Sequence, residues 1–310
     1  MTAKIHPILL FIFGLLCLVS CSNEEPVFNV DLSKREQTHF KTEKDVITYA
    51  YLPQYSHTVS YQRHHLLVEY LRRETGLNIK QIFPDTFDEH MNGVGQGKID
   101  ISFSNPFIYV KIAARYGARA FTRIVEINSG ENFRGQIICR ADNPAVKTTE
   151  DCRGKRWIAV DPTSAGGYLF PLGHFVAQGI TPNDFSEIVF APGPGGKQEK
   201  VVLAVYAGKY DVGTIREGTL NVVADKIDVK AIRVIATTRG YPGWVYAARA
   251  GLSRNIVDRI KTAFLKLNFD RDEHRPILEA AHFIRIIPSK DPDFDSIREL
   301  AEKIEICLEM

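Results

Sequence analysis

The stretch GKIDISF, residues 97–103, decides the fold because it has a near copy, GKYDVGT, at residues 208–214. Each copy follows a helical pattern, ends that helix with a glycine, turns through a lysine and an aspartate, and then starts a strand. Two short matches also arise by chance. A repeated βα unit explains them better, because the strand patterns around the second copy follow the same order as those around the first.

Strand and helix patterns alternate around the first copy. Residues 45–52 and 77–84 are rich in β-branched and aromatic residues, which predicts two strands. Residues 59–75 between them have a helical spacing that ends at Gly76. A second helix leads into GKIDISF, and this βαβαβ order is typical of a parallel sheet with covering helices. The strand patterns of the second set lie at residues 156–161, 186–193 and 211–215.

We therefore expect an α/β protein with two lobes, each a mostly parallel sheet flanked by helices. Lobe 1 is predicted to hold residues 44–128 and 235–310, and lobe 2 is predicted to hold residues 134–230. The chain is expected to cross between the lobes at 129–133 and at 231–234. Ligands of open α/β sheets bind at the carboxyl ends of the strands, so the two sheets are expected to share one ligand cleft.

The N-terminal residues 1–20 have the pattern of a secretory signal peptide. Lys4 precedes an apolar run of about sixteen residues, which is shorter than the ~20 residues of a membrane span. Small residues before Cys21 resemble the lipobox of bacterial lipoproteins, which implies cleavage before Cys21 and a lipid on it. Polar residues 21–43 are then a tether. An uncleaved anchor is the alternative, and both place the body in the periplasm or at the cell surface.

Composition excludes several classes of function. Lys4 is the only Lys, Arg, Asp or Glu residue among residues 1–20, so the remaining chain has 38 basic and 37 acidic side chains. Its net charge of +1 predicts no nucleic-acid partner. The chain has no metal-ligand spacing, nucleophile elbow or phosphate-binding loop of the known kinds. We therefore expect no metal, no cofactor and no enzymatic activity. Cys139 and Cys152 either pair in an oxidising compartment or stay free. With Cys307 the body has three cysteines, an odd number, so they cannot all form disulfides with one another.

Several stretches together resemble the phosphate/phosphite/phosphonate-binding proteins of bacterial ABC transporters. They are the lipobox, GQGKIDISFSNPFIYV, NFRGQIICRADNP, DCRGKRWIAVDPTSAGGYLFPLGHFVAQGI and EKVVLAVYAGKYDVGTIREGTL. The resemblance covers residues 45–270. It implies the type II periplasmic-binding-protein fold, a small-molecule anion as ligand and an ABC permease as partner.

The run AVDPTSAGGYLFPLG, residues 159–173, puts small and hydroxylated residues where a strand ends and a helix begins. A helix start has N–H groups without intrahelical acceptors, and small residues let an anion approach them. The resemblance implies a Ser-Thr-Ser-Gly run whose hydroxyls bind phosphonate. This chain keeps one hydroxyl of that run, which argues for a different small ligand. The predicted ligand contacts are Thr163, Ser164, Ala165, Gly166, Gly167 and Tyr168. The alternative is that Thr163 or Ser164 only caps the helix.

Four more candidate residues rest on the resemblance. Ser104 and Asn105 follow the strand at 99–103, in the loop that faces the ligand in the family, although an Asn-Pro turn is the alternative. Tyr55 lies in the loop after the first strand, where the family has a pocket aromatic. Gln198 stands where the family often has histidine, which is a second departure from the family pattern.

Arg216 and Glu217 end the predicted strand at 211–215. An arginine at the carboxyl end of a strand is a bidentate partner for a carboxylate or phosphate-type oxyanion. The alternative is an ion pair between Arg216 and Glu217 or a solvated surface charge.

The sequence thus favours a lipid-anchored solute-binding protein that closes on a small anion and passes it to a permease. The first alternative is a sensor module that docks on a separate membrane histidine kinase or cyclase. The second is an enzyme on the same fold, because a fold does not fix a function.

Overall fold

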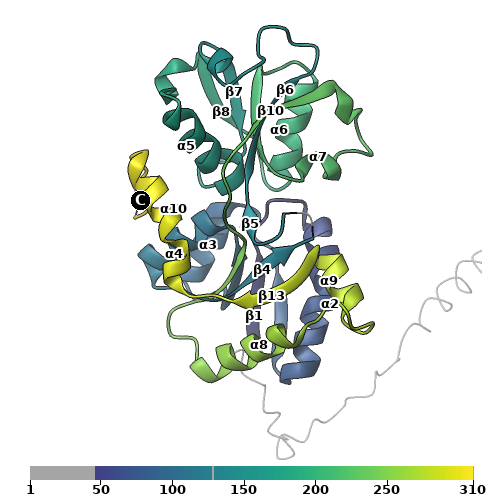
Figure 1. Ribbon diagram of the computed structural model, residues 1–310. Helices are drawn as coiled ribbons and strands as arrows, with labels where there is room; N and C mark the ends of the chain where they lie inside the picture. The colour runs from purple at the N-terminus through teal and green to yellow at the C-terminus, as the bar shows by residue number, and fades with distance from the viewer. Residues whose placement is uncertain (1–45, 128, 310) are drawn as a thin grey trace, which may run out of the picture. The chain divides into compact units, whose positions relative to one another are not determined.

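The computed structural model describes residues 46–127 and 129–309. The predicted signal peptide, the lipidation site at Cys21 and the tether lie outside the described residues. The described residues belong to one compact unit, which contains two large sheets and a short two-stranded one (Figure 1). Among the described residues, none of the helices is both long and apolar enough to cross a membrane.

The first sheet has six strands in the order β13-β4-β12-β3-β1-β2. Its strands are β1 (Val46–Tyr51), β2 (Asn78–Ile82), β3 (Ile101–Ser104), β4 (Arg119–Glu126), β12 (Val245–Ala248) and β13 (Phe283–Pro288). β1 pairs in parallel with β2 and β3, and the other neighbours are antiparallel. The helices that follow or cover these strands are α2 (His57–Thr75), α3 (Phe87–Gly95), α4 (Pro106–Tyr116), α8 (Arg254–Lys266) and α9 (Arg275–Ala281).

The second sheet has five strands in the order β10-β6-β9-β7-β8. They are β6 (Gly135–Arg140), β7 (Arg156–Ala159), β8 (Glu187–Phe190), β9 (Val212–Arg216) and β10 (Ile232–Thr237). Its helices are α5 (Phe170–Ala177), which continues a π-helical turn η5 (Ala165–Leu169), α6 (Lys197–Tyr206) and the short α7 (Thr219–Val222). α5 and α6 cover opposite faces of this sheet, because Phe175 and Val201 belong to separate apolar clusters (Figure 1).

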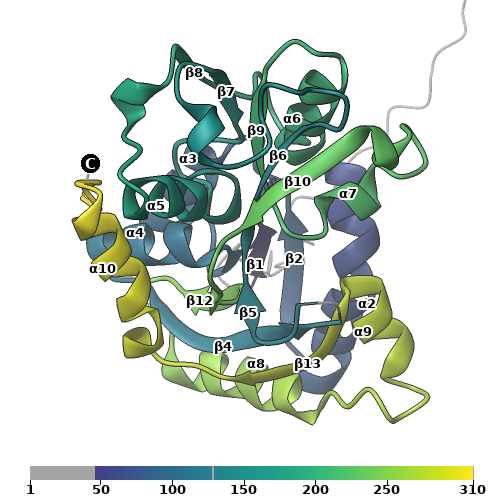
Figure 2. The same cartoon turned by 45° about the horizontal axis from the view of Figure 1, so that its top comes forward.

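The two segments that join the sheets pair with each other. β5 (Asn132–Phe133) lies antiparallel to β11 (Tyr241–Pro242), so the outgoing and returning crossings form one two-stranded ribbon. The C-terminal helix α10 (Asp295–Lys303) packs against α4, and Leu300 contacts the backbone of α5 at Gly173 (Figure 2). Helix α10 therefore touches elements that serve both sheets.

Two details of the predicted fold are corrected. Both sheets are mixed rather than mostly parallel, because antiparallel strands extend each βαβ core: β12, β4 and β13 in the first sheet, and β6 and β10 in the second. β10 also continues in the second sheet to Thr237, whereas the return crossing was expected at 231–234 and lobe 1 from residue 235. The return therefore follows Thr237, because β10 pairs with β6 from Gln136 to Arg140.

Apolar side chains from both sheets pack against each other where the loops meet. One buried cluster combines Ala165, Leu169 and Phe170 from the second sheet's side with Phe133 and Trp244 of the joining region. Burial of a leucine or phenylalanine side chain contributes about 1.5–3 kcal/mol, so the contacts of Leu169, Phe170 and Phe133 help to hold the carboxyl ends of the strands together. The candidate site lies beside it.

Candidate functional site

The predicted site residues stand at the carboxyl ends of strands, as the α/β arrangement requires. Tyr55 follows β1, Ser104 ends β3, and Arg216 ends β9. The run at Thr163–Gly167 follows β7 and leads into α5. Helix α4, which begins after Asn105, packs against η5, so the loops of the two sheets meet.

The polar groups of the loop after β7 are paired within the loop. The Thr163 N–H and hydroxyl both donate to Asp161 Oδ1, at 2.9 and 2.7 Å. Ser164 is the N-cap, and its hydroxyl accepts the Gly167 N–H at 3.1 Å. Asp161 in turn binds Lys197 Nζ at 2.5 Å. The capping role that the sequence left open is therefore present at Ser164.

The glycines of this loop allow close packing. A Cβ at Gly166 would lie 2.9 Å from both Arg216 Cβ and Phe133 Cζ, and one at Gly167 would lie 2.3 Å from Val160 Cγ2. Ala165 is fully buried. The helix start therefore lies directly against Arg216, and the N–H groups of its first turn have no acceptor within the helix.

Arg216 is the most enclosed charge of the site. Its side chain is 6% exposed, Nη2 donates to Glu126 Oε1 at 2.6 Å, and Nη1 donates to Gln54 Oε1 at 3.2 Å. Its guanidinium carbon lies 5.0 Å from the ring centre of Phe133 and 5.6 Å from that of Trp244. Nε is buried without a partner among the described residues.

Both members of the Arg216–Glu126 pair are charged. Burial raises the pKa of Glu126, but the charge of Arg216 and hydrogen bonds from Ser129 and Arg216 outweigh it and hold the pKa below its ordinary value. Burial lowers the pKa of Arg216, and the Glu126 charge more than compensates, so its pKa is raised. The pair thus joins β4 of the first sheet to β9 of the second as a carboxylate and a guanidinium.

A cavity of about 460 Å³ opens beside this pair. Elements of both sheets line it, with Tyr55, Val59, Gln62, Arg63, Glu126, Ile127, Ser129, Ala280 and His282 on one side and Arg216, Glu217, Gly218, Asn221 and Val222 on the other. The Arg63 guanidinium lies 4.6 Å from the ring centre of Tyr55 and has no carboxylate at ion-pair distance among the described residues. The cavity therefore presents Arg63 as a cation that is free to pair.

The structure brings some predicted residues together and separates others. Tyr55, Arg216 and Glu217 share the cavity, and Glu217 lies 3.6 Å from Arg134 rather than on Arg216. Gln198 Oε1 accepts the Arg216 N–H at 2.9 Å, so it positions that residue. Tyr168 faces away from the cavity, with its ring against Trp157 and Phe190.

The two predicted residues after β3 lie at the contact between α4 and η5. Asn105 caps α4, since its side chain accepts the N–H groups of Phe107 and Ile108, both at 2.9 Å. The Ser104 hydroxyl is fully buried and has no partner among the described residues.

Sequence reasoning missed several residues of this cavity. Gln54, Arg63, Glu126, Phe133 and Trp244 contact Arg216 or line the cavity with it. Gln54 precedes Tyr55 in the loop after β1, so its position at the end of a strand could have predicted it. Nothing in the local pattern distinguishes Glu126 or Arg63, because their roles arise from partners far away in the sequence.

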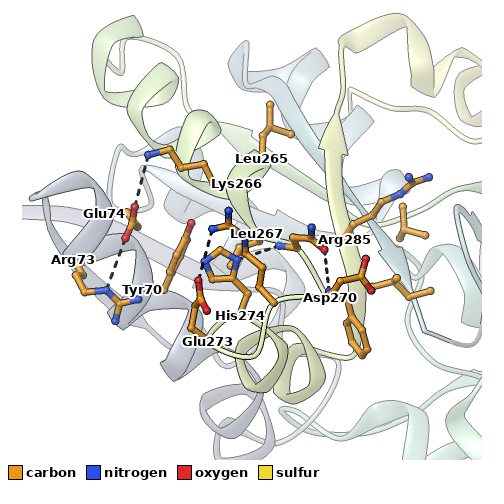
Figure 3. Close-up of a pocket in the computed structure, with 15 residues that line it drawn as sticks. Tyr70, Arg73, Glu74, Leu265, Lys266, Leu267, Asp270, Glu273, His274 and Arg285 are labelled. Atoms are coloured by element: carbon orange, nitrogen blue, oxygen red, sulfur yellow. Dashed lines mark hydrogen bonds and ion pairs between the residues drawn. The ribbon is translucent and has the colours of Figure 1, made fainter.

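A larger recess of about 1170 Å³ lies elsewhere in the molecule (Figure 3). The end of α2, residues 265–274 and β13 line it, so it belongs to the first sheet alone. Its Glu74 carboxylate lies 3.8 Å from Arg73 and 3.7 Å from Lys266. None of the predicted site residues reaches it, and a one-sided recess cannot close by bringing two sheets together.

The described part of the chain contains neither a candidate metal site nor a disulfide. Its His, Cys, Asp and Glu side chains form no group of three suited to a metal ion. Cys139 and Cys152 are buried free thiols, and Cys307 is an exposed one.

Residues 49–294 match the family model described as ABC transporter, phosphonate, periplasmic substrate-binding protein. The chain belongs to this family. The family consists of substrate-binding components of ABC transporters, which confirms the predicted family and the prediction of a binding protein rather than an enzyme. The match leaves out only the ends of the described region.

Curated relatives come from both transport and sensing. The phosphate-import protein PhnD of Mycolicibacterium smegmatis is 24% identical over 253 residues, which cover 76% of this chain and 78% of the relative. The tetrathionate sensor histidine kinase TtrS of Salmonella typhimurium is 24% identical over 194 residues, which cover 59% of this chain and 33% of the kinase.

Solved structures confirm the type II periplasmic-binding-protein fold. A binding-protein component of an ABC phosphonate transporter from Pseudomonas aeruginosa superposes with a TM-score of 0.74 at 20% identity, covering 84% of this chain and 86% of that one. PhnD1 of Prochlorococcus marinus in complex with methylphosphonate gives 0.75 at 14% identity, covering 85% and 99%.

Proposed function

We propose that this protein is a lipid-anchored, extracytoplasmic binding protein that captures a small oxyanion between its two sheets and delivers it to an ABC permease. Family membership supports the class of protein. We further propose that the ligand is an oxyanion, that it binds in the cavity beside Arg216, and that Cys21 carries a lipid.

The observation that carries the proposal is the buried Arg216 guanidinium beside a cavity that residues of both sheets line. A guanidinium presents its donors in a rigid fork that fits the oxygens of phosphonate, phosphate or carboxylate. Arg63, on the other side of the cavity, supplies a second positive charge. Closure of the sheets on an anion would place it between these two groups and away from water.

The loop at Ser164–Gly167 has a secondary part in this proposal. Its small residues lie against Arg216, so an anion at the guanidinium would be near the helix start. There the helix dipole adds attraction of about 0.3–1 kcal/mol.

A thermal-shift screen followed by calorimetry tests the proposal. Phosphate, phosphite, methylphosphonate, sulfonates, carboxylates and polyols are offered to the purified body, and a ligand at 100 times its Kd stabilises by about 2.7 kcal/mol. Arg216→Ala is expected to weaken binding of the ligand by about 1.5–3 kcal/mol, the range for hydrogen bonds to charged groups.

Arg249→Ala is the matched control for that variant. Arg249 pairs with Asp100 at 2.7 Å and does not line the cavity, so its loss removes a guanidinium from a carboxylate without touching the site. Equal affinity in wild type and Arg216→Ala would remove Arg216 from the site.

The lipid anchor is tested separately. Metabolic labelling with a radioactive fatty acid is expected to mark the wild type and not Cys21→Ala. Label on both proteins, or on neither, would contradict lipidation at Cys21.

A sensor module that docks on a separate membrane kinase is the second candidate. The likeness to part of TtrS favours it. Permease and ATPase genes beside this gene would favour transport, and a kinase or cyclase gene would favour sensing.

A further inference from the structure

The geometry points to Glu126 as a built-in competitor of the ligand. We propose that its carboxylate occupies Arg216 when no ligand is bound, holds the two sheets together, and must leave when an oxyanion binds. This inference rests on the proposed anion site at Arg216.

The pair spans the boundary between the sheets. Glu126 is the last residue of β4 in the first sheet, and Arg216 is the last residue of β9 in the second. They are 90 positions apart in the sequence, and the Glu126 Oε1 to Arg216 Nη2 distance is 2.6 Å. Ser129, in the outgoing crossing, donates its hydroxyl to the other oxygen of Glu126. The carboxylate is thus held at the joint between the sheets.

The guanidinium of Arg216 makes two side-chain hydrogen bonds, which use two of its five N–H groups. Nη2 is taken by Glu126 and Nη1 by Gln54, while Phe133 and Trp244 lie near its faces. Nε has no partner among the described residues. A bidentate oxyanion needs two adjacent N–H groups of the fork, and each such pair includes an N–H of Nη2. Its negative charge would then lie beside the Glu126 carboxylate at Nη2, so the anion and Glu126 compete for this nitrogen.

The surroundings make this exchange feasible. Arg63 lines the same cavity, has no ion-pair partner among the described residues, and contributes to lowering the pKa of Glu126. A released carboxylate thus has a second cation in the cavity. Glu217 lines the cavity as well, but its carboxylate is 3.6 Å from Arg134 and makes no contact with Arg216. Competition is therefore specific to Glu126.

An occupied site lowers the apparent affinity in proportion to the fraction of molecules that are free to bind. If about one molecule in ten has Arg216 free, removal of the competitor tightens binding about tenfold. The same removal also takes away a contact between the sheets, so the ligand-free protein is expected to open.

Glu126→Gln is the test variant, and Glu131→Gln is its matched control, with the same change of charge at a carboxylate that pairs with Arg123 at 2.7 Å and does not line the cavity. Calorimetry with inorganic phosphate and with methylphosphonate is expected to give about tenfold tighter binding for Glu126→Gln and little change for Glu131→Gln. Equal tightening in both variants would show a general charge effect and overturn the inference. Weaker binding in Glu126→Gln would overturn it too.

Small-angle scattering of the ligand-free proteins separates this inference from the proposed function. A larger radius of gyration for Glu126→Gln than for wild type and Glu131→Gln supports the contact between the sheets, even if neither anion binds to any of the proteins. Absence of binding in all three would count against the proposed ligands alone. Equal radii together with equal affinities would overturn the role of Glu126.

Discussion

The loop at Thr163–Gly167 and the end of β9 at Arg216 were both predicted to hold an anion, and the structure treats them differently. In the loop, the hydroxyl groups make their hydrogen bonds within the loop: Thr163 donates to Asp161, and Ser164 accepts the N–H of Gly167. At Arg216 the partners come from another sheet, one nitrogen is unpaired, and a cavity lies alongside. The hydrogen bonds of the loop are explained by its own structure. The buried charge of Arg216, which pairs across two sheets beside a cavity, indicates a ligand site.

The largest expected effect comes from unpairing this charge. Arg216→Ala leaves Glu126 without its cation in a largely buried place, which destabilises by about 3–5 kcal/mol when one partner of a buried pair is removed. Chemical denaturation measures this loss. The double variant Glu126→Ala/Arg216→Ala is expected to recover part of the stability. A double variant that is as unstable as the sum of the two single ones would show that the pair is not coupled.

A buried histidine offers a contrast to the buried ion pair, because it must stay neutral. Burial lowers the pKa of His90 to about 3. The unfolded chain protonates this group near pH 6.5, so the free energy of unfolding should fall as pH drops below 6.5, by roughly 1 kcal/mol per pH unit.

Denaturation between pH 7 and pH 5 checks the role of His90. His90→Gln keeps a polar group toward Ser102, whose hydroxyl lies 2.7 Å from Nε2, and should make the pH dependence less steep. Part of the dependence should remain, because burial lowers the pKa of His64 as well. The exposed contacts of His65 make His65→Gln a control. The same slope in wild type and His90→Gln would contradict this account.

Gly166→Ala tests how tightly the loop lies on Arg216. The added Cβ would sit 2.9 Å from Arg216 Cβ and from Phe133, so the backbone must shift, and overpacking costs about 1–3 kcal/mol. Thermal unfolding measures it. An unchanged midpoint would mean that the loop and Arg216 separate easily, which would weaken the link between the two regions.

The smallest effect is expected at Ser164. Ser164→Ala removes the cap on Gly167 and should cost about 1 kcal/mol of stability. If the hydroxyl only caps, the affinity of the anion identified in the screen should fall no further than this stability loss explains. Ser164→Thr, which keeps a hydroxyl, is the control. A loss of affinity without a loss of stability would return Ser164 to the ligand site.

Local patterns predicted the βα units well. The helix end at Gly76 is confirmed, with φ of 63°, and the strands after each Gly-Lys-x-Asp turn are present as β3 and β9. The antiparallel strands were harder, because β4 and β13 pair with each other across more than a hundred residues and show no distinguishing pattern.

The candidate site was predictable only in part: Tyr55 on one side of the cavity and Arg216 and Glu217 on the other were predicted from the sequence. Arg216 was found because it ends a strand that the repeat located. Its partner Glu126 was not, since an acidic residue at the end of β4 looks like any solvated carboxylate until the fold brings the strand ends together. Arg63 was missed for the same reason, on a helix whose face toward the cavity depends on tertiary packing.

A crystal structure of the protein with the tightest-binding anion of the screen tests the central claim most directly. The account predicts the anion's oxygens within hydrogen-bonding distance of the Arg216 guanidinium, with the Glu126 carboxylate withdrawn from Nη2. An anion bound elsewhere, for example in the recess beside Tyr70, with the Arg216–Glu126 pair intact, would contradict it.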